Sequence, residues 1–107
     1  MDPEEYEKAF QMIAAAGNAK SNAMLAIRAA REGDFESAHT LLKDADHDIH
    51  TAHSTQTDML TEEARGNQVK VNIILVHAQD HLTGALLTRD LAEELVKIHE
   101  KLAAATA

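Results

Sequence analysis

Proline occurs only once in this chain, at Pro3, and this scarcity constrains the fold more than any other feature of the sequence. Proline interrupts helices because it lacks a backbone N–H and clashes with the preceding turn. A chain without interior proline is therefore free to form long helices. Most apolar residues are Ala, Leu, Ile and Val, with Tyr6, Phe10 and Phe35 as the aromatic residues. These features predict an all-α protein.

Local signals mark where the first helix begins and ends. Asp2 is a suitable N-cap, Pro3 fits the first helical position, and Glu5 stands where a capping-box partner belongs. Gly33 provides a C-terminal stop, and Asp34 is suited to cap the next helix. The first helix should therefore end just before Gly33, and the second should begin just after Asp34.

A second turn signal, Gly66-Asn67, ends the second helix. The third helix is predicted to begin near Val69 and to run to about Ala104. Three helices of roughly 30 residues would each be about 45 Å long. Short connections place consecutive helices antiparallel. The prediction is a single domain over residues 1–107, an antiparallel up-down-up three-helix bundle.

The first two predicted helices carry apolar stripes with spacings of three and four residues. In the first helix the stripe contains Tyr6, Phe10, Ile13, Gly17, Lys20, Met24, Ile27 and Arg31. In the second it contains Phe35, Ala38, Leu42, Ala45, Ile49, Ala52, Gln56 and Met59. Gly17 costs about 1 kcal/mol relative to alanine inside a helix, and we interpret it as a point of close packing against a neighbouring backbone.

The third predicted helix is apolar on more than one side. Residues 73–76 are Ile-Ile-Leu-Val, and Leu82, Leu86 and Leu87 again cover more than one face. A helix at the edge of a three-helix bundle needs only one buried stripe. A second apolar face indicates a contact surface, and we expect the chain to self-associate.

Charge and composition exclude several classes of protein. The formal net charge of −8 disfavours nucleic-acid binding, which usually requires a basic surface. The absence of cysteine excludes disulfides and thiolate chemistry. No apolar run approaches the roughly 18 residues of a membrane span, and the acidic N-terminal segment does not resemble a signal peptide. We therefore expect a soluble, cytoplasmic protein without direct membrane insertion.

The strongest chemical signal follows the apolar run of the third helix. His77, Asp80 and His81 are spaced i, i+3 and i+4, which places them on one helix face, whereas Gln79 points well away. The pair His77-x-x-x-His81 has zinc-ligand spacing, but the zinc-protease motif requires Glu where this chain has Ala78. A weak metal site remains one interpretation. The alternative is a nucleophilic imidazole that accepts a phosphoryl group.

The other histidines carry weaker signals. His39, His47 and His50 lie among aspartates, which is typical of a solvated helix face rather than of a closed metal site. His99 lies near the C-terminus, where a cationic imidazole suits the helix dipole. His53 lies beside the predicted buried stripe, and a lone histidine in such a place is more often a hydrogen-bonded core residue than a ligand.

The segment Val76-His77-Ala78-Gln79-Asp80-His81-Leu82 resembles the signature of the lactose/cellobiose-type enzyme IIA proteins of the bacterial sugar phosphotransferase system. Three further segments agree with this family in order and spacing. They are Ala16-Gly17-Asn18-Ala19-Lys20-Ser21, Gly33-Asp34-Phe35 and Ala52-His53-Ser54-Thr55-Gln56-Thr57. The resemblance covers nearly the whole chain.

The resemblance implies a homotrimer whose helices form a nine-helix bundle. It implies that His77 accepts phosphate from the histidine-containing phosphocarrier protein and passes it to a cysteine of enzyme IIB during sugar uptake. Asp80 would meet its two symmetry mates around a divalent cation, typically one Mg²⁺ per trimer on the threefold axis. Gln79 and His81 would be active-site neighbours. Oxygen ligands suit magnesium, which would also offset the repulsion between Asp80 and a phosphorylated His77.

Three positions depart from the usual family pattern. Lys20, Thr51 and Thr83 stand where the family usually has Arg, Glu and Met. Lysine lacks the bidentate geometry with which arginine binds phosphate. We interpret these departures as subgroup variation, and the sequence does not identify the sugar. The alternative function is a non-catalytic helical oligomerisation or adaptor bundle, in which the polar cluster fixes the register of the oligomer.

Overall fold

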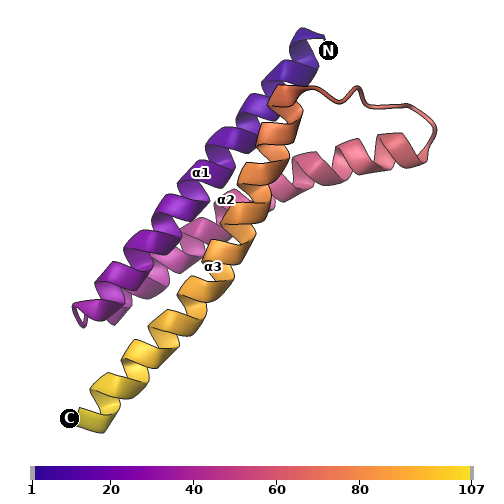
Figure 1. Ribbon diagram of the computed structural model, residues 1–107. Helices are drawn as coiled ribbons and strands as arrows, with labels where there is room; N and C mark the ends of the chain where they lie inside the picture. The colour runs from indigo at the N-terminus through magenta and orange to yellow at the C-terminus, as the bar shows by residue number, and fades with distance from the viewer. Residues whose placement is uncertain (1, 107) are drawn as a thin grey trace.

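The computed structural model describes residues 2–106, and every regular element in this range is a helix. The helices are α1 (Pro3–Arg31), α2 (Phe35–Ala64) and α3 (Ile73–Thr106). They run up, down and up in an elongated bundle of 58 × 22 × 18 Å, so that α1 and α3 are parallel (Figure 1). In the described range no helix combines the length and the hydropathy needed to cross a bilayer. Met1 and Ala107, the ends of the predicted domain, lie outside the described residues.

The predicted signals at the first two helix boundaries are confirmed. The Asp2 carboxylate accepts a hydrogen bond from the Glu5 backbone N–H, and the Glu5 carboxylate accepts one from the Asp2 N–H. Gly33 has φ of +84°, a conformation that favours glycine. The Asp34 side chain then caps α2 by accepting from the Ser37 N–H. These local contacts explain why α1 and α2 begin and end where the sequence indicates.

The predicted start of the third helix near Val69 is wrong, because α3 begins at Ile73. The Val69 N–H donates to the Glu63 carboxylate, which holds this part of the chain against the end of α2 in a non-helical conformation. The Asn72 side chain accepts from the Leu75 N–H and acts as the N-cap of α3. At the other end, α3 continues to Thr106, beyond the expected end near Ala104.

The core within one protomer consists mainly of alanine. Among the 18 buried apolar residues of the described range, the largest that are fully buried are Met12, Leu82 and Val96. The α1 face that packs against α2 and α3 contains Ala9, Met12, Ala15, Ala16, Ala19, Ala23, Ala26 and Ala30. Alanine leaves little side-chain volume between helices, so their axes can lie close together.

The predicted stripe of α1 therefore lies beside the buried face, with Ile13 and Ile27 partly buried against the core and other members exposed. Phe10 is 55% exposed and Met24 is 40% exposed. The interpretation of Gly17 as a point of close packing is also wrong for the protomer, because a Cβ added there would meet no atom within 4 Å. The sequence stripe of α1 follows its large apolar residues, whereas the buried face of this helix consists of alanines and Met12. The stripe forms an outer apolar face instead.

The second helix is anchored mainly to α1, and its contact with α3 is much smaller. Polar side chains connect α2 and α3 at separate points along the bundle. Arg89 Nη2 of α3 lies 3.0 Å from Asp46 Oδ2 of α2, and Glu100 Oε2 lies 3.2 Å from His39 Nε2. The C-terminal part of α2 diverges from the other two helices before the chain turns back toward α3 (Figure 1).

Candidate functional site

The two histidines predicted to share a helix face are in direct contact. His77 Nε2 and His81 Nε2 are 2.9 Å apart, with the ring centroids 4.3 Å apart and the planes nearly perpendicular. His77 is exposed and His81 is half-buried. The i, i+4 spacing on α3 produces this contact, because residues one turn apart lie above one another. One imidazole nitrogen donates the hydrogen bond and the other accepts it.

His77 lies at the edge of an apolar groove of about 440 Å³ between α1 and α3. Phe10 and Ile13 of α1 line one side of this groove. The other side comes from the first turns of α3 and contains Ile73, Ile74, Val76, His77 and Asp80. Two large side chains of the α1 stripe, those of Phe10 and Ile13, therefore extend the apolar surface beside His77.

Asp80 shares the groove with His77, but the two side chains form no hydrogen bond in the described structure. Asp80 is exposed and lies in a row of exposed apolar residues along α3, which we call the outer seam. The outer seam consists of Ile73, Val76, Asp80, Leu87, Leu91 and Ile98. The described residues of one protomer contain no group of three or more His, Cys, Asp or Glu side chains that could hold a metal ion. One protomer thus contributes a single carboxylate to any site on this seam.

Gln79 faces the opposite side of α3 from the groove. Its side-chain oxygen accepts a hydrogen bond from the side-chain nitrogen of Gln56 in α2. The structure therefore brings His77 and His81 together but directs Gln79 to the α2 side of the same protomer. The partnership of Gln56 and Gln79 was missed by the sequence analysis, because it joins residues 23 positions apart on different helices.

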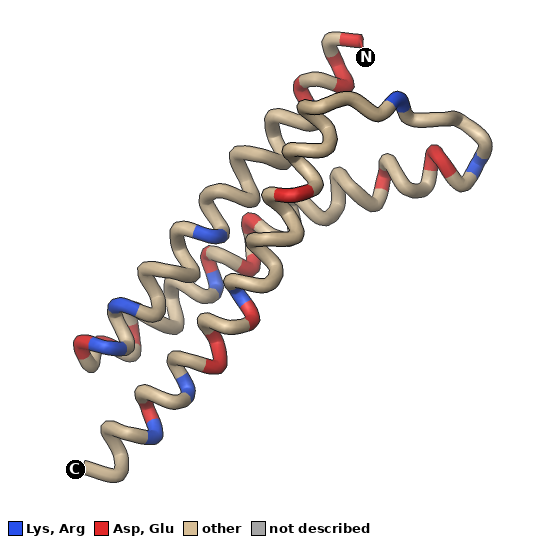
Figure 2. The backbone as a smooth tube through the Cα atoms, in the orientation of Figure 1, with Lys and Arg blue, Asp and Glu red and all other residues tan. Residues whose placement is uncertain are grey.

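The bundle contains few charges at the level of His77. Residues 9–19 of α1 and 49–57 of α2 contain no Lys, Arg, Asp or Glu, and Asp80 is the only such residue in 71–88. We call these three segments the charge-poor belt. In Figure 2 long tan stretches mark these segments in the upper part of the tube, and a single red band interrupts the one in α3. Charge depletion is typical of the centres of protein–protein interfaces.

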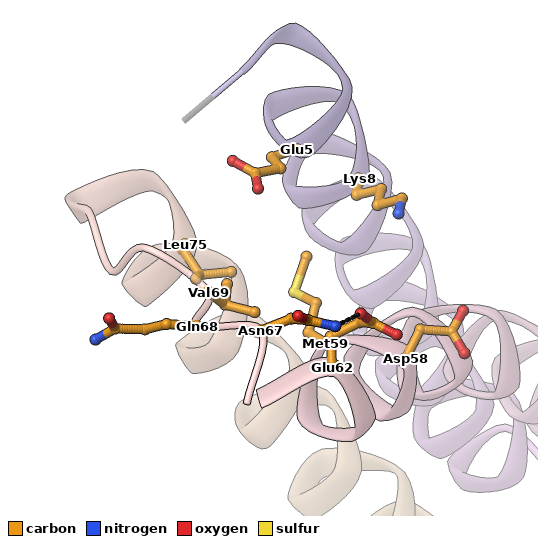
Figure 3. Close-up of a pocket in the computed structure, with 9 residues that line it drawn as sticks. All are labelled: Glu5, Lys8, Asp58, Met59, Glu62, Asn67, Gln68, Val69 and Leu75. Atoms are coloured by element: carbon orange, nitrogen blue, oxygen red, sulfur yellow. Dashed lines mark hydrogen bonds between the residues drawn. The ribbon is translucent and has the colours of Figure 1, made fainter. Parts of the chain in front are cut away.

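A separate cavity of about 210 Å³ lies beneath the connection between α2 and α3 (Figure 3). Met59, Val69 and Leu75 contribute apolar surface to it. Of the acidic residues in its lining, Glu5 is engaged in the α1 capping box, and Glu62 accepts a hydrogen bond from Asn67. His77 does not line this cavity. The Glu5 and Glu62 carboxylates of this cavity therefore serve the ends of α1 and α2 rather than the histidine site.

The remaining histidines do not join the site. His39 contacts Glu100, while His47 and His50 are exposed, in agreement with the predicted solvated face. The prediction that His53 is a core histidine is wrong, because its side chain is exposed. Ala52 is the last of the buried residues of α2, and the C-terminal part of this helix diverges from the other two helices, which leaves its side chains open to solvent (Figure 1).

The three departures from the family pattern lie on the surface. The Thr51 hydroxyl donates to the His47 carbonyl of its own helix. Lys20 forms no ion pair with any residue that the structure describes. It lies seven residues beyond Ile13, a groove residue, which corresponds to about 10 Å along α1. Lys20 is therefore not positioned to contact His77 in the same protomer.

The family described as "PTS system, Lactose/Cellobiose specific IIA subunit" matches residues 7–100 of the chain. The chain belongs to this family. The match includes the whole groove-lining part of α1 and the His77–His81 pair. This IIA chain is therefore a component of a sugar phosphotransferase system, as the resemblance of the His77 segment indicated.

Individual relatives agree with this assignment. The IIA chain is 40% identical over 102 residues to the lichenan-specific phosphotransferase enzyme IIA component of Bacillus subtilis, covering 95% of this chain and 93% of that protein. It is similar to the crystal structure of the cellobiose-specific enzyme IIA of Bacillus anthracis, with a TM-score of 0.91, 38% identity and coverage of 97% and 94%. The predicted helical topology is confirmed by this similarity.

A third relative was solved together with another protein. It is the IIA(Chitobiose) chain in the solution structure of the IIA(Chitobiose)-HPr complex from the Escherichia coli phosphotransferase system. The two chains superpose with a TM-score of 0.80 and are 35% identical, with coverage of 96% of this chain and 99% of that one. The sugar differs between these relatives, which agrees with the finding that the sequence does not identify one.

Proposed function

We propose that this IIA chain is a phosphohistidine carrier in sugar uptake. His77 accepts a phosphoryl group from the histidine-containing phosphocarrier protein and passes it to a cysteine of enzyme IIB. The single observation that carries this proposal is the position of His77: an exposed imidazole that lines an apolar groove, with its Nε2 2.9 Å from the Nε2 of a second imidazole, that of His81. The HPr complex of the chitobiose relative supports the first partner.

The chemistry requires a nucleophile and little else from this chain. The lone pair of a neutral His77 imidazole forms a bond to phosphorus, while the bond between phosphorus and the donor nitrogen breaks and leaves its electron pair on the donor ring. In the second transfer a cysteine sulfur of enzyme IIB attacks the phosphorus, and the electron pair returns to His77. Phosphoryl transfer depends mainly on positioning and charge stabilisation. The apolar groove would exclude water from the phosphohistidine when a partner covers it.

The test is phosphorylation by the phosphocarrier protein, with His77→Gln as the variant. We expect wild type to acquire acid-labile phosphate and His77→Gln to acquire none, with unchanged helicity. His47→Gln is the matched control, because His47 is exposed on α2, lies outside residues 49–57 and does not line the groove. Labelling of His81 or His53 in the His77→Gln variant would contradict the assignment. Absence of labelling in wild type would instead favour the adaptor function.

We also propose that the working form is a trimer with α3 at its centre. The outer seam of α3 supports this, because its large apolar side chains are exposed in one protomer and require a covering surface. Three copies of α3 around one axis would bury the seam and give the nine-helix bundle. Sedimentation equilibrium at micromolar concentrations should return three times the chain mass.

Asp80 is the residue that we propose to hold Mg²⁺ in this trimer. Its carboxylate lies on the outer seam, and a single carboxylate per protomer is a fitting contribution to a site shared by symmetry-related copies. Carboxylate oxygens are ligands that magnesium prefers. The bound cation would supply positive charge close to the histidine site. Isothermal titration of the trimer with MgCl₂, compared with Asp80→Asn, would measure this binding directly.

A further inference from the structure

Two of the four glycines lie inside helices, and backbone conformation does not explain them. Gly33 and Gly66 adopt positive φ just beyond the ends of α1 and α2, where glycine is favoured. Gly17 and Gly84 lie within α1 and α3 and are not among the residues with positive φ. Compared with alanine, an interior glycine lowers the ratio of folded to unfolded chain about fivefold. Within one chain no close contact offsets this loss at Gly17, because a Cβ added there would meet no atom of the described residues within 4 Å.

Gly17 forms a notch in the outer face of α1. It follows Ile13 by four residues and Phe10 by seven, so the three positions share one side of the helix. Phe10 and Ile13 line the apolar groove beside His77, and Gly17 continues the same wall without a side chain. Seven residues further on, Met24 is 40% exposed on this side of α1. The helix backbone is therefore bare at Gly17, between larger apolar side chains and beyond the end of the groove. We call this position the α1 notch.

Gly84 lies at about the same level of the bundle as the α1 notch. The boundary between the two clusters of buried core residues falls at residues 15–16 of α1 and 82–85 of α3. Gly17 and Gly84 both lie near this boundary, because α1 and α3 run parallel (Figure 1). Gly84 follows Asp80 by four residues and therefore belongs to the face of the outer seam. The two glycines that conformation does not explain thus border one surface, formed by the groove and the outer seam.

We propose that α3 of a neighbouring copy lies along the groove and contacts the backbone of α1 at the α1 notch. This inference rests on the proposed trimer. The groove and the outer seam form one continuous surface, because Ile73, Val76 and Asp80 belong to both. A neighbour whose α3 packs on the seam is therefore brought against Phe10 and Ile13 as well. Where that helix passes the α1 notch, the missing side chain lets the two helix backbones approach closely.

A second copy of the chain fits this surface better than a transient partner. In residues 9–19 and 71–88, parts of the charge-poor belt, Asp80 is the only Lys, Arg, Asp or Glu, so two copies can meet here without burying further charges of these kinds. A helix that contacts both α1 and α3 of its neighbour needs apolar side chains on more than one side. The start of α3 provides them, because Ile73 is 79% exposed on the seam and Ile74 lines the groove. The loss of helix stability at Gly17 is permanent, and only a permanent contact offsets it at all times.

The experiment compares Gly17→Ala with Asn18→Ala. Alanine is the better helix former at both positions. Neither change should disturb the single chain, because the Cβ position at Gly17 is open and Asn18 is exposed on another side of α1. In sedimentation equilibrium we expect Gly17→Ala to raise the overall dissociation constant of the trimer about 100-fold or more, since a methyl group must be fitted into three equivalent contacts. Its melting temperature at micromolar concentration should fall. Asn18→Ala should raise the melting temperature and leave the dissociation constant unchanged.

The sign of the change in melting temperature distinguishes a covered notch from an open one. If no neighbour covers the α1 notch, Gly17→Ala melts at a higher temperature than wild type, because alanine favours the helix. With a trimeric wild type, that result overturns this inference alone. An unchanged dissociation constant together with slower phosphorylation by the phosphocarrier protein would assign the notch to that protein, and would also overturn the inference. A wild type that sediments as a single chain overturns the proposed trimer as well, whereas phosphate uptake by His77 is measured separately.

Discussion

Replacing Leu91 by alanine should weaken the proposed trimer while leaving the fold of the single chain intact. Leu91 lies on the outer seam of α3 and is 54% exposed in one protomer. Complete burial of a leucine side chain contributes about 1.5–3 kcal/mol, so covering the remaining half contributes about 1 kcal/mol per copy. Three copies give about 3 kcal/mol per trimer, which corresponds to about a 100-fold increase in the overall dissociation constant. Any cavity left at the axis would add to this effect.

Sedimentation equilibrium over a range of protein concentrations measures this constant, and circular dichroism reports whether the helices are retained. Leu60→Ala is a matched control, because Leu60 is 61% exposed but belongs to α2 and not to the outer seam. The Leu60→Ala protein should associate like wild type. A dissociation constant that Leu91→Ala leaves unchanged, or an equal loss in both variants, would refute the assignment of the outer seam as the trimer interface.

Three further predictions concern charged groups. The Asp80→Leu protein should stay associated as the proposed trimer without metal, because packed hydrocarbon would replace carboxylates that repel one another. If chelator changes the melting temperatures of wild type and variant equally, Asp80 is not a metal ligand. Arg89→Met should lower the free energy of unfolding by about 1–2 kcal/mol, which allows for the 50% and 38% exposure of the partner side chains of Asp46 and Glu93. Urea titration would measure this loss, with Arg28→Met as the control variant. The hydrogen bond from Arg89, together with its charge, holds the pKa of Glu93 below its ordinary value. The stability that this pair contributes is present above the ordinary pKa of glutamate and is lost as the pH falls through the lowered pKa of Glu93. Glu93→Gln should therefore lose less free energy of unfolding on acidification than wild type. The same loss at acidic pH in both proteins would contradict the pairing.

The sequence was sufficient to predict helix boundaries wherever a side chain caps its own helix. Asp2, Glu5 and Asp34 act over three residues, and such contacts depend on local spacing alone. The start of α3 was predicted four residues too early because it depends on the Glu63 carboxylate, which holds the Val69 backbone from six positions away. The buried face of α1 was missed for a related reason: only packing against two other helices determines which stripe is covered.

The candidate site also contains contacts within one helix, which the sequence predicts, and contacts between helices, which it does not. The contact of His77 with His81 follows from i, i+4 spacing on one helix and could be predicted. That Phe10 and Ile13 line the groove depends on the parallel register of α1 and α3, which spacing within one helix does not encode. The direction of Gln79 depends on a partner in α2. Predictions within a helix therefore succeeded, and relations between helices required the structure.

The alanine-rich interior has a consequence for the calorimetry of the isolated protomer. Alanine side chains expose little apolar surface when a chain unfolds, and 13 of the 18 buried apolar residues among residues 2–106 are alanine. Apolar exposure is the source of the positive heat-capacity change of unfolding. The heat-capacity change of unfolding of a dissociated chain should therefore be lower than the roughly 1.4 kcal/mol/K usual for a chain of this length. Its denaturant m-value should also be low. A plot of its free energy of unfolding against temperature would be broad and shallow. Stronger curvature, as in a protein with a core of larger apolar residues, is expected only when several copies assemble and cover the outer seam.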